Sequence, residues 1–279
     1  MPKRHVAPSE PALSRWSTSG KERSTRASET GTRRTPERQE AARPANQVNT
    51  SPPQPEPSRI LLITLTVLTI VSGVVDAVSY LGLGHVFTAN MTGNVVVLGF
   101  AAAGAKGFSI AASLTSLGSF LLGAAVAGRI CLHIGSRRRW LVFAMAAEGG
   151  FTGAAAIASA LASGIVGAGW ARYTVIALLA FAMGVRNSTI RRLAVPEMTT
   201  TVLTLTLTGL AADSSLAGGH NPRAARRTSA VLAMLVGAIA GAGLFLHQGA
   251  TWPLAIVAVV VLVTATLFAM SKASKQLDA

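Results

Sequence analysis

The chain has 279 residues, of which 50% are hydrophobic and 13% carry a charge, against about 25% charged in ordinary soluble domains. A soluble fold cannot bury so large an apolar fraction, so composition argues against a soluble protein. The formal net charge is +14, but the basic residues beyond the first 59 positions lie between long apolar runs, as the positive-inside rule predicts. We therefore expect anionic lipid as the electrostatic partner, and no nucleic acid.

The first 58 residues predict a disordered Pro/Arg/Ser-rich cytoplasmic tail. They contain nine of the 12 prolines and no long aliphatic run, so they cannot bury enough apolar surface to offset the entropy of ordering. The tail ends in a proline-rich stretch, residues 51–57, that favours an extended conformation. We expect a transmembrane helical domain over residues 59–271 and a short cytoplasmic C-terminus over 272–279.

Six long apolar segments follow the tail, and each is long enough to cross a hydrocarbon core of ~30 Å as a helix. Trp140, Trp170 and Trp252 each open a segment, where interfacial aromatic residues are common. The sequence thus predicts an all-α, polytopic membrane protein with about six transmembrane helices. The segments cover residues 60–81, 108–134, 140–162, 170–190, 229–247 and 252–270.

Two shorter apolar segments, near residues 91–105 and 198–212, are too short to span comfortably. If both cross, the flanking basic residues divide almost evenly between the two sides. If both are re-entrant or half-helices, nearly all basic residues fall on the side of the tail, which the positive-inside rule favours, with both termini cytoplasmic. The tail side then holds Arg59, Arg137, Arg138, Arg139, Arg186, Arg191, Arg192, Arg223, Arg226, Arg227, Lys272 and Lys275, and the other side holds Lys106 and Arg172.

An internal repeat relates the two halves, about 59–165 and 166–271. The sequence Gly-Val-Val-Asp at 73–76 matches Gly-Val-Arg-Asn at 184–187, and Met-Thr at 91–92 matches Met-Thr at 198–199. In both halves the order is span, short segment, span, span. Three crossings per half make the repeats inverted, a layout common in transporters.

Two motifs resemble the signatures of a known family. Residues 72–77 (Ser-Gly-Val-Val-Asp-Ala) with 86–94 (Val-Phe-Thr-Ala-Asn-Met-Thr-Gly-Asn), and later 184–187 with 195–204, are similar to those of the YoaK-like bacterial membrane proteins, also called domain of unknown function 1275. The resemblance covers about residues 60–271. It implies an integral membrane protein of about six spans and implies no substrate. The chain departs from the family pattern at Arg186-Asn187, where Gln or Asn often precedes a small residue.

Charged residues within the apolar segments are the first candidates for a functional site, because an acid in lipid is costly unless it is paired or wet. Asp76 lies in the first span, where it either serves function or caps a neighbouring loop. Glu148 lies close to mid-membrane, and the alternative to function is a hydrogen bond to another helix in its protonated state. Arg186 and Asn187 occupy the matching position of the second half.

The starts of the two short segments are the second candidates. Asn90, Thr92, Gly93 and Asn94 surround one start, and Thr199, Thr200 and Thr204 lie in the other. Helix starts prefer Asn and Thr as caps, which is the structural interpretation. Two half-helix starts meeting at mid-bilayer would instead aim free N–H groups at a shared polar site.

These features favour a small-solute or ion transporter or channel, with a small polar solute as ligand. The alternative is a non-transporting membrane scaffold or assembly factor; an intramembrane enzyme and a sensor are less favoured. The sequence has no paired carboxylates, metal-ligand spacing, phosphate loop or nucleophile motif, so we expect no enzyme, no cofactor and no metal. The expected location is the cell membrane.

Overall fold

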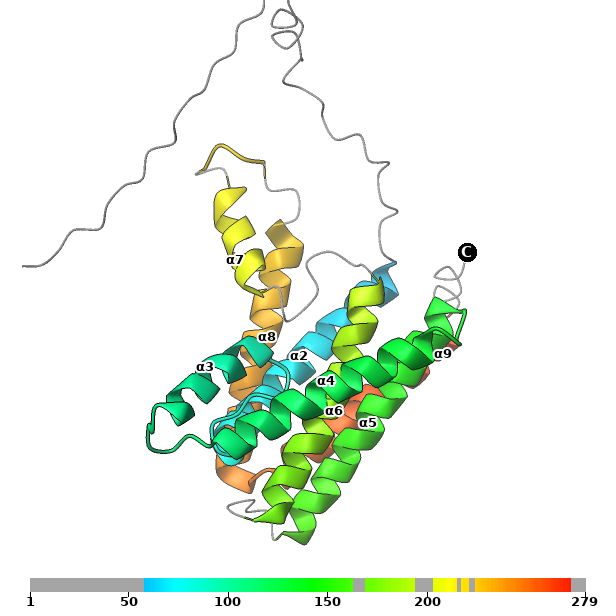
Figure 1. The fold of residues 1–279 in the computed structure, drawn as a ribbon. Coiled ribbons are helices and arrows are strands. Elements are labelled where there is room, and N and C mark those ends of the chain that lie inside the picture. The colour runs from blue at the N-terminus through cyan, green and yellow to red at the C-terminus, as the bar shows by residue number, and fades with distance from the viewer. Residues whose placement is uncertain (1–57, 163–168, 194–202, 215–216, 221–223, 272–279) are drawn as a thin grey trace, which may run out of the picture. The chain divides into compact units, whose positions relative to one another are not determined.

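The computed structural model describes residues 58–162, 169–193, 203–214, 217–220 and 224–271. The expected N-terminal tail and the C-terminus beyond residue 271 lie outside the described residues, as do Thr199 and Thr200. Within the described residues the regular elements are eight helices, which confirms the all-α fold (Figure 1).

Six of the helices are long and apolar enough to cross a membrane, and two are short. A helix of 20 residues rises about 30 Å, the thickness of the hydrocarbon core. The long helices are α2 (Arg59–Gly82), α4 (Ile110–Cys131), α5 (Arg137–Leu161), α6 (Trp170–Leu193), α8 (Ala224–Gln248) and α9 (Thr251–Met270). The short helices are α3 (Met91–Ala102) and α7 (Leu203–Ala212).

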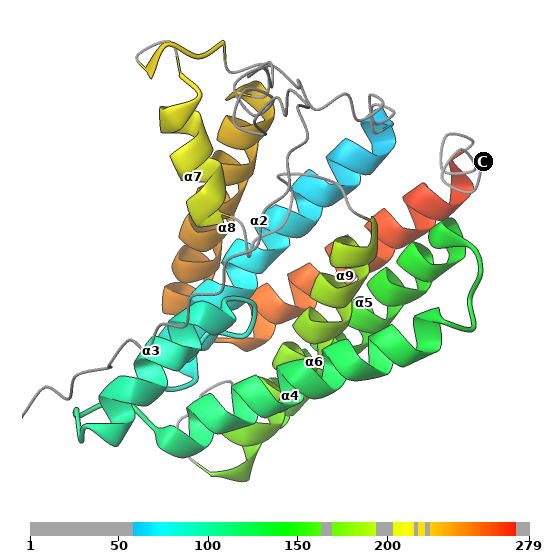
Figure 2. The same ribbon diagram turned by 45° about the horizontal axis from the view of Figure 1, so that its top comes forward.

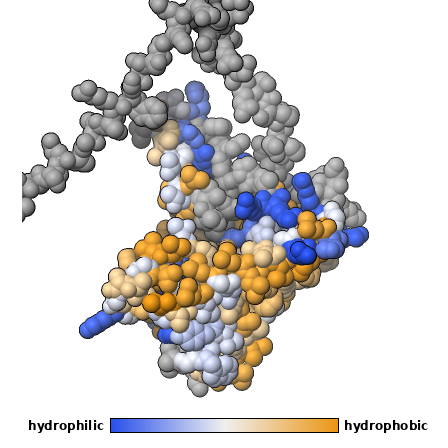
Figure 3. All heavy atoms as spheres, viewed as in Figure 1, coloured by the Kyte–Doolittle hydropathy of each residue, from blue (hydrophilic) through white to orange (hydrophobic). Residues whose placement is uncertain are grey.

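Polar residues set several helix starts. The side chain of Ser109 accepts a hydrogen bond from the amide of Ala112 at the start of α4, and Ser136 accepts one from the amide of Arg139 at the start of α5. Both satisfy amides that the first helical turn leaves without partners. The apolar side chains between these ends leave a large apolar surface, which Figure 3 shows over α3 and α4. The main buried core lies among α2, α5, α6 and α9.

Three helix pairs form the most extensive contacts: α2 with α8, α4 with α6, and α5 with α9 (Figure 2). The helices α2 and α8 run in the same direction, since Gly237 packs against Ile70 and Gly241, one turn later, packs against Val74. The short helix α3 packs mainly on α4, and α7 mainly on α8.

The helices α5 and α9 run in opposite directions. At one end of the pair Arg138 donates a hydrogen bond to the carbonyl of Ala269. At the other end the hydroxyl of Thr251 donates to that of Ser159 at 3.0 Å. The start of α5 therefore lies beside the end of α9.

These directions decide whether the short helices cross. Each crossing reverses the chain, and two long helices separate α5 from α9. The pair is antiparallel only if α7 does not add a crossing. Three long helices separate α2 from α8, and this parallel pair then requires that α3 does not cross either. The packing therefore gives six crossings, in agreement with the distribution of basic residues.

The ends that flank α3 also lie together. His85, just after α2, is within hydrogen-bonding distance (3.1 Å) of the carbonyl of Gly107 through its Nδ1 atom, just before α4. The rings of His85 and Phe108 lie 5.6 Å apart. The chain thus enters and leaves α3 on the same side, as expected for a re-entrant element.

Equivalent glycines support the internal repeat. A Cβ atom on Gly73 of α2 would collide with the backbone of Met234 in α8, and one on Gly184 of α6 would collide with the backbone of Phe120 in α4. Gly184 is the residue that the sequence repeat aligns with Gly73. Because only glycine lets two backbones approach so closely, the two crossings are built in the same way. A repeat with three spans per half is inverted, as the sequence predicts.

One residue counted among the flanking charges is placed differently. Arg186 is 2% exposed and lies inside the bundle, so it is not a membrane-flanking charge. Removing it leaves the strong bias of basic residues toward one side unchanged. The sequence places Arg186 near the end of an apolar segment, which is why it was expected on the tail side. The sequence does not show that Glu148 pairs with Arg186 inside the bundle.

Candidate functional site

Three ionisable side chains and one hydroxyl are buried together in the bundle. Ser72 and Asp76 lie one turn apart on α2, Glu148 lies at the middle of α5, and Arg186 lies on α6. Their exposed fractions are between 0% and 5%. We call Ser72, Asp76, Glu148 and Arg186 the central polar cluster.

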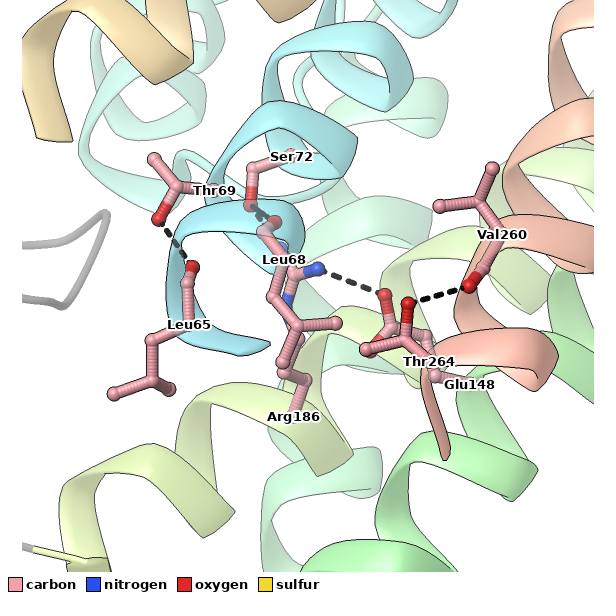
Figure 4. A network of polar contacts seen from close by, with 8 residues as sticks. All are labelled: Leu65, Leu68, Thr69, Ser72, Glu148, Arg186, Val260 and Thr264. Atoms are coloured by element: carbon pink, nitrogen blue, oxygen red, sulfur yellow. Dashed lines mark hydrogen bonds and ion pairs between the residues drawn. The ribbon is translucent and has the colours of Figure 1, made fainter. Parts of the chain in front are cut away.

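Arg186 connects the three helices that form this cluster. Its Nη1 atom donates to Oε1 of Glu148 at 2.7 Å, and its Nη2 atom donates to the hydroxyl of Ser72 (Figure 4). Ser72 in turn donates to the carbonyl of Leu68 at 3.2 Å. Burying an unpaired charge in a low-dielectric interior costs roughly several kcal/mol of desolvation free energy. An ion pair with additional hydrogen bonds offsets that cost. Nothing in the sequence links Arg186 to Glu148, whereas the structure pairs them.

The cluster is not saturated with hydrogen bonds. Among the described residues, Oδ2 of Asp76, Oε2 of Glu148 and Nε of Arg186 are buried and have no hydrogen-bond partner. Buried polar atoms are usually partnered, so such atoms are candidates for contact with a ligand or water. The cluster therefore has both acceptor and donor capacity left over.

Asp76 binds the loop that leads into α3. Its Oδ1 atom accepts hydrogen bonds from the amides of Thr88 at 3.0 Å and Ala89 at 2.8 Å. Asp76 lies more than one helical turn before the end of α2 at Gly82, so the loop turns back along the helix to reach it. The half-helix consequently begins beside the central polar cluster.

Asn94 fixes the same loop from the other side. Its side chain accepts from the amide of Phe87 at 2.8 Å and donates to the carbonyl of Phe87 at 2.6 Å. It also donates to the hydroxyl of Ser116 on α4 at 3.0 Å, and that hydroxyl donates to the carbonyl of Phe87 at 2.6 Å. Asn94 is fully buried, and its side chain holds both the amide and the carbonyl of Phe87 in place.

The other candidates at the start of α3 lie differently. Asn90 is exposed and accepts a hydrogen bond from the amide of Gly93 at 3.4 Å, the geometry of a helix cap. Thr92 is exposed. Gly93 packs under the ring of Phe87, where a Cβ atom would lie 2.7 Å from the ring. This start thus divides into a buried face with Asn94 and an exposed face with Asn90 and Thr92.

The second half contributes less to this cluster. Asn187 is half-buried, and its Nδ2 atom has no hydrogen-bond partner among the described residues. Thr204 is exposed on α7, and its carbonyl accepts a hydrogen bond from Thr208 at 2.9 Å. Thr199 and Thr200 lie outside the described residues, so the shared site between two half-helix starts stays a prediction.

Two hydroxyl residues of the site were not among the sequence candidates. Ser72 lies four residues before Asp76 and hence on the same face of α2, a spacing that could have identified it. Ser116 carries no such signal, because its role depends on how α4 packs beside the loop.

Comparison with known proteins places the chain in a family. The family described as "Protein of unknown function (DUF1275)" matches residues 64–267, a region that includes most of α2 and α9, the other four long helices in full and the whole central polar cluster. The chain belongs to the DUF1275 family. This confirms the resemblance seen in the sequence motifs.

A curated relative agrees with this assignment. This DUF1275 protein is 33% identical over 156 residues to "UPF0700 transmembrane protein YoaK" of Bacillus subtilis (strain 168). The aligned region covers 54% of this chain and 66% of the relative. The matched region thus spans slightly less than two thirds of that relative. No solved structure matches the chain. The relative and the six apolar helices together identify a multi-pass membrane protein.

Proposed function

We propose that this DUF1275 protein moves a small polar solute or an ion across the cell membrane, and that the central polar cluster is part of the path. The observation that carries this proposal is the burial of Asp76, Glu148 and Arg186 together, from three helices, within segments long and apolar enough to span a bilayer. Ionisable side chains at such positions are costly and rare, and they mark ion or substrate pathways.

The half-helix beside the cluster supports the same function. Interrupted or re-entrant backbone at membrane depth is tolerated where it lines protein or water, and transporters place substrate sites beside such elements. The loop before α3 meets Asp76 in this way. The inverted arrangement of the two halves is the architecture on which alternating access is commonly built.

The second candidate function is a non-transporting scaffold. It is favoured by the hydrogen bonds of Asp76 and Asn94, which both hold the loop before α3 and would serve structure alone. A scaffold would use the cluster only for stability, and it would gain nothing from a bound solute.

Thermal unfolding of the purified full-length protein, measured against a panel of ions, amino acids, amines and small organic acids, separates the two functions. Transport predicts that at least one compound raises the unfolding midpoint and is taken up by proteoliposomes. Glu148→Gln should abolish both effects, and Asp213→Asn, at the exposed residue that follows α7, should abolish neither. Uptake that Glu148→Gln leaves intact would remove the cluster from the path, and a panel without any stabilising compound would favour the scaffold.

A further inference from the structure

The central polar cluster has an uneven number of charges. Asp76 and Glu148 are buried acids, and within the described residues Arg186 is the one base of the cluster, hydrogen-bonded to Glu148 and Ser72, so full ionisation leaves one negative charge in excess. A net charge held inside a low-dielectric bundle is unfavourable, and the cluster is most stable when one positive charge joins it. Binding of one proton or one monovalent cation would therefore neutralise the cluster.

Among the described residues, no other helix packed on α2 supplies that charge. The helix α9 carries no charged residue, and α3 carries none. On α8 the titratable residues Arg226, Arg227 and His247 lie in its first and last turns, away from the crossing at Gly237. On α4 the basic residue is Arg129, in the last turn. On the remaining parts of α5 and α6 the titratable residues lie toward the helix ends: Arg137, Arg138, Arg139, Arg172, Tyr173, Arg191 and Arg192.

The geometry at Asp76 suits a proton better than a metal cation. Its Oδ1 atom already accepts two backbone hydrogen bonds, and its Oδ2 atom is the one left without a partner among the described residues. One free oxygen can carry one proton. A bound metal cation needs several oxygen ligands, and the described part of the chain holds no group of three His, Cys, Asp or Glu side chains that could ligate one.

Building on the proposed transport function, we infer that Asp76 takes up one proton from water and that this proton is the coupling ion of the site. The proton bonds to Oδ2 of Asp76, no bond of the protein breaks, and the cluster changes from one excess negative charge to neutrality. The same carboxyl group then holds the loop less tightly, because a neutral carboxyl accepts hydrogen bonds more weakly than a carboxylate.

Release of the loop is confined to a short stretch. Phe87 stays bound by Asn94 and Ser116, which do not titrate, so the change falls on Thr88 and Ala89. These residues directly precede Asn90 and the start of α3. Protonation thereby loosens the base of the half-helix, which is how a proton taken up at Asp76 is coupled to opening of the path.

Hydrogen–deuterium exchange of the full-length protein in lipid nanodiscs tests this inference without knowledge of the solute. Exchange of the peptide that covers residues 83–94 is followed from pH 9 to pH 5 and corrected for intrinsic exchange. We expect protection of the Thr88 and Ala89 amides to fall at least about tenfold on acidification, because two charge-assisted hydrogen bonds weaken. Substitution Asp76→Asn should give low protection at every pH, and Asp213→Asn should follow the unmodified protein.

A second variant keeps the test decisive if Asp76→Asn does not fold. Glu148→Gln removes the excess acid, so Asp76 should keep its charge longer and the loss of protection should move to more acidic pH. Protection that is independent of pH in the unmodified protein, or that changes with sodium at constant pH and ionic strength, would overturn the proton assignment. A solute that binds and is transported without any such pH effect would leave the proposed function intact and reject this inference alone.

Discussion

At the scale of single residues, the environment of each charge decides what its removal costs. The pair between Arg186 and Glu148 is almost fully buried, with exposed side-chain fractions of 3% and 0%. The pair between Arg227 and Asp213 has a similar N–O distance of 2.6 Å, but the Asp213 side chain is 52% exposed. The two pairs therefore form a matched comparison of the same chemistry inside and outside the bundle.

Glu148→Ala should lower the free energy of unfolding by about 3–5 kcal/mol, because it leaves the guanidinium of Arg186 buried without its partner. Asp213→Ala should cost at most about 1 kcal/mol, since water screens the exposed carboxylate of Asp213. Equilibrium unfolding in detergent measures both. Replacing Glu148 and Arg186 together by Leu should recover much of the loss; equal costs for Glu148→Ala and Asp213→Ala would show that the buried pair is not formed.

Asn94→Ala should destabilise the protein by about 1–3 kcal/mol, because it leaves the amide and the carbonyl of Phe87 short of partners. Asn90→Ala is the matched control on the same helix start. It removes one cap hydrogen bond at an exposed position and should cost about 1 kcal/mol or less. The unfolding midpoint is the measurement. Equal losses for the two variants would mean that Asn94 acts only as a cap and does not hold the loop.

At the scale of helices, close backbone contact at glycine fixes how the elements cross. Gly73 and Gly184 occupy equivalent positions on α2 and α6, and each faces the backbone of a helix from the other half. In lipid the helices gain little from burying apolar surface, so close packing of small residues provides much of the attraction between them. Each half thus depends on the other for its main contact.

Gly184→Ala should destabilise the bundle by about 1–3 kcal/mol or more, because the new methyl group must displace the backbone of α4. Gly73→Ala should have a similar effect at the equivalent crossing. Gly118→Ala on α4 is the control, since a Cβ atom there meets nothing within 4 Å. It should be neutral or stabilising by up to ~1 kcal/mol, because Ala favours helix. A midpoint lowered equally by Gly184→Ala and Gly118→Ala would contradict the crossing.

At the scale of the whole molecule, the helix directions and the charge distribution lead to the same topology. With six crossings, the connections after α3 and after α5 lie on one side of the membrane. The starts of α5 and α8 lie on the second side. From the positive-inside rule we predict that the second side, together with both termini, is cytoplasmic.

Cysteine accessibility in intact cells should therefore give opposite results at two exposed sites, Lys106 and Ala225. In a background with Cys131→Ala, Lys106→Cys should react with a membrane-impermeant reagent added outside. Ala225→Cys should react only after the membrane is permeabilised, and Arg137→Cys should behave like Ala225→Cys. Labelling of Lys106→Cys and Ala225→Cys from the same side would reject the six-crossing topology.

The sequence by itself determined the class of the protein, the six spans and the short segments, and it predicts the repeat. Each of these depends on local composition: an apolar run of about 20 residues is stable as a helix in lipid wherever its neighbours lie. Family membership could likewise be recognised from short motifs such as residues 86–94. The positions of Asp76 and Glu148 within apolar runs were enough to name both as candidates.

Only the tertiary structure decided which side chains meet. Arg186 and Glu148 are 38 positions apart, and nothing in the local pattern indicates that α5 and α6 bring them together with Ser72 of α2. The same holds for the return of Thr88 and Ala89 to Asp76. Such contacts depend on how helices from the two halves pack, and packing is set by the complementarity of whole helix surfaces, which the spacing of residues along one segment does not contain.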